Sequence, residues 1–182
     1  MIRLTKFLHT ILLLGAVAFA VTAQAQMPDV KEPVQSAMQS VSVMAGDWTG
    51  SSWTVSPDGS RKNAQMHETI QWKLENTVLL IEGVGKNEQG DNAHHALGIL
   101  SFEPFSKTYQ LNSHIAEGLS TTASFEVVLP NEKFLWGYEV PGGEIRFTIT
   151  LSQNGTHWHE KGEFSPDGTN WYPTMEMNLD KE

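Results

Sequence analysis

The sequence predicts an all-β fold, an antiparallel up-and-down barrel of about ten strands with one short N-terminal helix. From Asp47 onward, apolar and polar residues alternate with a period of two, the pattern of strands that bury one face. Short segments with turn chemistry separate these runs, among them Pro57-Asp58-Gly59 and Asn154-Gly155. Short strands joined by short links favour antiparallel neighbours, and closing such a sheet into a barrel removes its two exposed edges.

Residues 1–25 have the features of a secretory signal peptide. Arg3 and Lys6 precede an apolar stretch over residues 7–21, and Ala23-Gln24-Ala25 then provides the small residues of a cleavage site. The alternative is an uncleaved membrane anchor, but a bilayer span takes about 20 apolar residues and this stretch is shorter. We therefore expect a soluble exported protein, periplasmic or extracellular, that begins at Gln26.

Residues 26–45 predict a leader followed by one short amphipathic helix. Val34, Met38, Val41 and Met44 recur at steps of four and three, which is a helical period. Gly46 ends the pattern, as glycine commonly does after a helix.

The remaining residues, 46–182, are predicted to form a single β-barrel domain. We place its strands near 47–56, 64–74, 78–87, 94–103, 107–116, 120–128, 132–140, 143–152, 156–165 and 171–180.

The hairpin around Asn154-Gly155 bears on His157 and His159, whose spacing of two puts both rings on one face of a strand. With a two-residue turn, Ser152 faces His157 and Thr150 faces His159, so both histidines lie on the polar face. A solvated outer face explains them without a metal. If the lumen is polar, that same face looks inward instead.

Composition excludes several classes of function. The chain has no cysteine, which rules out disulfides, a thiol nucleophile and thiolate metal ligands. After loss of Arg3 and Lys6, ten Lys and Arg stand against 21 Asp and Glu, a net charge of about −11. Because phosphate contacts depend on Lys and Arg, we expect no nucleic-acid partner and no membrane partner after signal cleavage.

Catalytic and metal-binding signals are weak. Common catalytic and nucleotide-binding motifs are absent. If Glu103 pairs with Lys107, His94 and His114 become diagonal neighbours on one face, but two histidines do not make a zinc site, and no metal is predicted. An acid–base pair could come from Glu139, Glu144, Glu160 and Glu163, and the sequence does not show which of these is buried.

Aromatic residues are the main candidates for binding. The six tryptophans, Trp48, Trp53, Trp72, Trp136, Trp158 and Trp171, all lie in or beside predicted strands and either fill the core or line a lumen. Met66, Met175 and Met177 could line the same lumen adaptably. The candidate lumen residues are Trp72, Trp136, Tyr138, His94, His114 and Met175.

Two segments carry a resemblance to a known family. MAGDWTGSSW (44–53) places Gly46-Asp47-Trp48 after a helix and at the start of the first strand. This resembles the opening of the calycin superfamily, which includes lipocalins, fatty-acid-binding proteins and nitrobindin-like barrels. The resemblance implies that Trp48, with Gly46 beside it, plugs the closed end. ALGILSFEPFSKTYQL (96–111) is similar to a hairpin of small secreted bacterial calycin-like proteins without established activity.

Two features of the superfamily are missing from the sequence. Lipocalins pack an arginine from a late strand on the tryptophan, and here no arginine follows Arg146. Nitrobindin-like barrels hold haem through a histidine near the chain end, whereas the last histidine here is His159, so no cofactor is predicted. The predicted function is binding of a small apolar or amphipathic molecule. The alternatives are a hydrolase or isomerase using polar lumen residues, and a protein-interaction module with a filled barrel.

Overall fold

The structure is a computed structural model and describes residues 28–182. The predicted signal peptide (1–25) and the new N-terminus at Gln26 lie outside these residues. Within the described part of the chain, no helix is long and apolar enough to cross a membrane.

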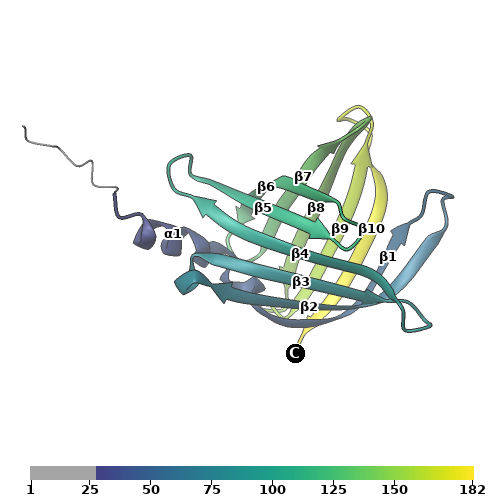
Figure 1. Cartoon of the computed structure of the whole chain (residues 1–182), viewed down its shortest axis with the longest axis horizontal. Helices are drawn as coiled ribbons and strands as arrows, with labels where there is room; N and C mark the ends of the chain where they lie inside the picture. Colours follow the sequence, from purple (N-terminus) through teal and green to yellow (C-terminus); the bar gives the residue numbers. More distant parts are fainter. Residues whose placement is uncertain (1–27) are drawn as a thin grey trace, which may run out of the picture.

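Ten antiparallel strands form a closed barrel, which confirms the predicted fold class (Figure 1). Each strand pairs with its neighbours in sequence, and the first strand pairs with the last. The strands are β1 (Gly46–Val55), β2 (Arg61–Lys73), β3 (Val78–Lys86), β4 (Asn92–Glu103), β5 (Thr108–Ile115), β6 (Ser120–Leu129), β7 (Lys133–Val140), β8 (Gly143–Ser152), β9 (His157–Ser165) and β10 (Tyr172–Lys181).

One end of the barrel is closed by the N-terminal helix α1 (Lys31–Met38) and the 3-10 helix η1 (Gln39–Met44). Figure 1 shows α1 lying across this end, beside the connection between β2 and β3. The four residues of the predicted helical period, Val34, Met38, Val41 and Met44, are all buried. Asn131, between β6 and β7, accepts a hydrogen bond from the Val43 amide and donates to the Gln39 carbonyl, which holds η1 against the barrel.

Trp48 forms the floor at this closed end. Its side chain is fully buried, its indole N–H donates to the Met44 carbonyl at 2.8 Å, and its ring meets Trp158 edge to face at 5.4 Å. Lys181 places its ammonium 4.9 Å from the Trp48 ring centre and donates to the Val43 carbonyl at 2.9 Å. A lysine of the last strand therefore lies over the tryptophan where lipocalins use an arginine.

Gly46 is required by this arrangement. Its φ of +138° is disfavoured for residues with a side chain, and a Cβ there would lie 2.6 Å from Cε of Lys181. Gly46 thus begins β1 and leaves room for the side chain of Lys181, which lies over the Trp48 ring.

The register of the β8–β9 hairpin is as predicted. Ser152 is opposite His157 and Thr150 is opposite His159, although the connection is four residues long rather than two. Both histidines lie on the outer face, where they pair with β10: Nδ1 of His157 is 2.8 Å from Asp180, and Nε2 of His159 is 3.0 Å from Glu176.

The predicted register of β4 and β5 is wrong by one residue. Glu103 pairs with Thr108 rather than Lys107, because Lys107 takes a left-handed conformation (φ 56°) and belongs to the loop. His114 is consequently opposite Leu97 and exposed on the outer face, since a shift of one residue reverses the side a strand residue faces. His94 and His114 therefore do not share a face.

Candidate ligand-binding cavity

The barrel encloses a cavity of about 730 Å³ that all ten strands line. Met44 of η1 reaches it from the closed end, and exposed residues such as Asn63, Leu119 and Pro141 line it at the opposite end, where it opens. A filled barrel, one of the expected alternatives, is not what the described residues form. The volume is in the range of sites that hold small organic molecules.

One wall of the cavity consists of small residues. Gly83 of β3, Ala96 and Gly98 of β4 and Ser113 of β5 all line it. These strands adjoin one another in the barrel, so their short side chains leave space on one side of the lumen. The cavity therefore exists partly because these inward-facing positions have small side chains or none.

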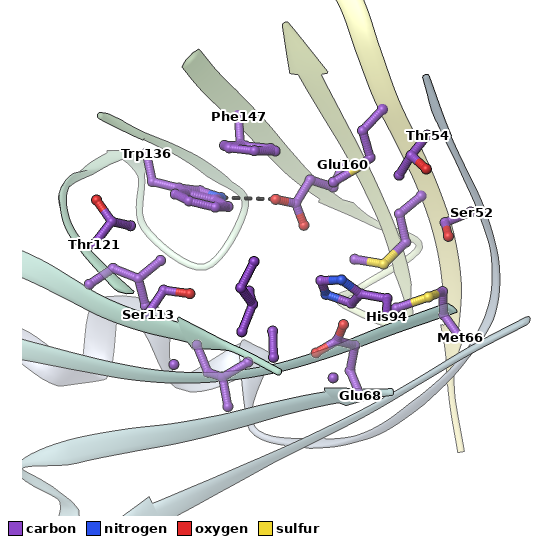
Figure 2. A pocket seen from close by; sticks show the side chains of 18 of the residues that line it. Ser52, Thr54, Met66, Glu68, His94, Ser113, Thr121, Trp136, Phe147 and Glu160 are labelled. Atoms are coloured by element: carbon purple, nitrogen blue, oxygen red, sulfur yellow. Dashed lines mark hydrogen bonds between the residues drawn. The ribbon is translucent and has the colours of Figure 1, made fainter. Parts of the chain in front are cut away.

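The opposite wall is aromatic. Trp136 of β7 and Phe147 of β8 stack with ring centres 3.8 Å apart and planes 10° from parallel. Tyr138 extends the stack, with its ring centre 6.2 Å from that of Trp136. Figure 2 shows Trp136 and Phe147 together on one side of the cavity. A wall of flat rings suits a ligand with a flat or apolar body.

Glu160 of β9 brings a carboxyl group into this apolar surrounding. It is 5 % exposed and accepts hydrogen bonds from the indole N–H groups of Trp136 (2.9 Å) and Trp158 (3.2 Å). Burial raises the pKa of Glu160 to about 7, while the two indole donors oppose the rise. Figure 2 shows its carboxyl group pointing into the cavity.

Glu68 of β2 is the second buried carboxyl that lines the cavity, 8 % exposed. Its group lies over Gly83, directly opposite on β3, where a Cβ would overlap the carboxyl oxygens. Burial, and to a lesser extent the nearby charge of Glu160, raise the pKa of Glu68 to about 8. Among residues 28–182, no protein group is hydrogen-bonded to Glu68.

His94 of β4 lines the cavity nearer the mouth, where it remains accessible to solvent. Partial burial of the imidazole ring lowers the pKa of His94, and the negative charge of Glu117 acts in the opposite direction. Lys62 and Glu139, both exposed, are the other charged side chains that line the cavity, and they lie at the mouth.

The structure brings four of the six predicted lumen residues to the cavity: Trp136, Tyr138, His94 and Met175. Trp72 does not line it, because this residue near the end of β2 packs against the core below the cavity. His114 does not line it either, since the register places it outside. That the four residues contact a ligand stays a prediction.

The two buried carboxyls are the functional candidates that the sequence analysis did not place. Glu160 is one of the four glutamates among which the sequence suggests an acid–base pair. Glu68 is not one of these four. The alternation of inner and outer residues along a strand could have identified them. Glu68 lies two residues from both Met66 and Ile70, and Glu160 lies two residues from Trp158, so each glutamate faces the same side as these apolar residues. Within residues 28–182, no three His, Asp or Glu side chains gather closely enough to hold a metal ion.

A closed ten-stranded barrel with a tryptophan floor and a hollow lumen resembles the calycin-like barrels whose opening the Gly46-Asp47-Trp48 motif suggests. No protein-family model and no curated protein sequence matches the chain.

Two solved structures share the fold. Rv2717c from M. tuberculosis superposes with a TM-score of 0.60 at 12% identity, over 80% of this chain and 97% of that one. The S-type phycobiliprotein lyase CPES from Guillardia theta superposes with a TM-score of 0.54 at 5% identity, over 85% and 98%. At these identities the likeness establishes the fold alone.

Proposed function

We propose that this protein binds a small, partly apolar organic molecule inside the barrel. The observation that carries the proposal is the cavity of about 730 Å³, with its aromatic wall and only a few polar groups on its surface. Binding sites for small molecules combine these features, since apolar walls contribute affinity and a few polar groups set the orientation. A phycobiliprotein lyase has the same fold, and this supports the proposal that a barrel of this kind acts on another molecule.

We place this binding function outside the cytoplasm. Support comes from the signal-peptide features of residues 1–25. The protein would then hold its ligand in the periplasm or in the medium.

Native mass spectrometry of protein purified from its own host tests the binding function. We expect an organic ligand to co-purify, and Ser52→Phe to abolish its retention because Ser52 lines the cavity. Ser51→Phe is the matched control, since the adjacent Ser51 is exposed on the outer face of β1. A wild-type protein that carries no organic mass, or a ligand retained by Ser52→Phe, contradicts the proposal.

A second candidate function, an isomerase, is favoured by the two buried carboxyls. Burial keeps the pKa values of Glu68 and Glu160 near neutrality, where a carboxyl can both accept and donate a proton. The result expected of this second function is that wild-type protein converts the recovered ligand to an isomer that carries carbon-bound deuterium from D₂O, and that Glu160→Gln does not. A ligand recovered without deuterium excludes it.

A further inference from the structure

We propose that the ligand of this cavity is an organic cation, an amine with a flat apolar body, whose charged nitrogen lies between Glu68 and Glu160. The inference rests on the proposed binding function and specifies the chemistry of its ligand. Four features of the cavity support it: an unpartnered carboxyl, a second carboxyl nearby, the positions of the charged groups and the aromatic wall.

Glu68 is the group that needs a ligand. More than nine-tenths of the residue is buried, and within the described chain its carboxyl oxygens have no hydrogen-bond partner and face the cavity. Among the described residues no fully buried side-chain oxygen lacks a partner, so the Glu68 oxygens are open to the cavity, where a ligand can reach them. The geometry around it is specific, since β3 has Gly83 at the one position where a side chain would displace the carboxyl. A donor on a ligand would satisfy this group.

Glu160 defines the other side of the same subsite. Figure 2 shows the carboxyl groups of Glu68 and Glu160 both directed into the cavity. The two indole N–H groups hold the Glu160 carboxyl in place, and both of its oxygens are used. A cation between the two carboxyls would favour their charged forms, which burial and the repulsion of Glu68 by Glu160 otherwise disfavour.

The charges around the subsite leave it without a positive partner. The titratable or charged side chains that line the cavity are Glu68, Glu160, Glu139, His94, Lys62 and Tyr138. Lys62 is the single Lys or Arg among them, and it lies exposed at the mouth. The deep part of the cavity is therefore acidic without an internal counter-ion, an arrangement that selects for cations and rejects anions.

The aromatic wall fits the remainder of such a ligand. Trp136 donates to Glu160 while its ring face stacks on Phe147, so one side chain contacts both the carboxyl and the apolar wall. The small-residue wall, with Gly83 and Ala96, leaves space for a flat body against these rings.

Calorimetric titration with three indoles of the same shape tests the inference. The probes are tryptamine, which is cationic, tryptophol, which is neutral, and indole-3-acetate, which is anionic. At pH 7.5 we expect tryptamine to bind at least about tenfold more tightly than tryptophol, and indole-3-acetate not to bind. Titration in buffers of different ionisation enthalpy should show release of about one proton per bound tryptamine, because the cation ionises a carboxyl that is protonated in the free protein.

Two variants and a control assign the effect to the subsite. Glu68→Gln and Glu160→Gln should each weaken tryptamine binding by about tenfold and leave tryptophol binding unchanged. Glu126→Gln, exposed on the outer face of β6, removes one carboxylate elsewhere and should have no effect. Thermal melting of each variant establishes that the barrel is folded.

Three results would overturn the inference: equal or tighter binding of tryptophol, binding of indole-3-acetate, or no binding of any probe at millimolar concentration. Tryptamine binding without proton release overturns it as well. None of these bears on the proposed binding function, which the ligand mass in host-purified protein decides separately.

Discussion

Ionisation of Glu68 should destabilise the barrel as the pH rises. The pKa of this buried carboxyl is raised from 4.5 to about 8, and a tenfold change in a dissociation constant corresponds to about 1.4 kcal/mol. The folded state therefore binds a proton that the unfolded chain has lost between these two pH values, and its stability falls across that window. The stabilisation is fully present below pH 4.5 and lost above pH 8, a loss of about 5 kcal/mol.

Glu68→Gln removes this titration while keeping the shape of the side chain. In urea unfolding followed by tryptophan fluorescence, the variant and the wild type should have similar stability near pH 4. By pH 9 the variant should be more stable by about 3–5 kcal/mol, a large share of the 5–15 kcal/mol of a typical domain. Glu126→Gln again provides the control for loss of a carboxylate at an exposed position. A difference between Glu68→Gln and wild type that stays constant from pH 4 to pH 9 would refute the reasoning.

Three further predictions concern the floor, the outer histidines and the N-terminus. Trp48→Ala should lower the free energy of unfolding by about 3–5 kcal/mol, because a fully buried indole is lost; a loss under about 1 kcal/mol in urea unfolding contradicts its role as the floor. His157→Ala with His159→Ala should alter stability by no more than about 0.5 kcal/mol, and Zn²⁺ should not raise the melting temperature of wild-type protein. N-terminal sequencing of protein from the exported fraction should begin at Gln26; an intact Met1 in the membrane pellet would argue for an anchor instead.

Much of the fold could be predicted because one face of each strand is buried. Polar and apolar residues alternate regularly on both sides of Asn154-Gly155, and this pattern predicted the cross-strand partners of His157 and His159 correctly. The prediction held although the connection is longer than two residues. The β4–β5 register could not be predicted in the same way. It depends on Lys107 adopting a left-handed conformation, which no residue pattern in that loop specifies, and a one-residue error there moved His114 to the wrong face.

The site was harder to predict than the fold. Glutamate on a strand is ordinarily a solvent-facing residue, so Glu68 and Glu160 were not separated from the other carboxylates by composition. Their alternation with apolar neighbours indicates that they face inward. Their burial depends on Gly83 of β3 leaving room for Glu68, and on the indoles of Trp136 (β7) and Trp158 (β9, the same strand) reaching the Glu160 carboxyl. Such contacts come from strand order and shear, which are tertiary properties.

Closure of the barrel by its first and last strands has a consequence for folding kinetics. Trp48 pairs with Lys181 across the β1–β10 seam, so the floor joins residues from nearly opposite ends of the domain. The other strand pairings join neighbours in sequence, so this seam closes the longest loop of the sheet and we expect it to form late. Until β10 arrives, β1 and β9 are both unpaired edges open to another chain. We therefore expect a partly synthesised or truncated chain to be most prone to aggregation at this seam.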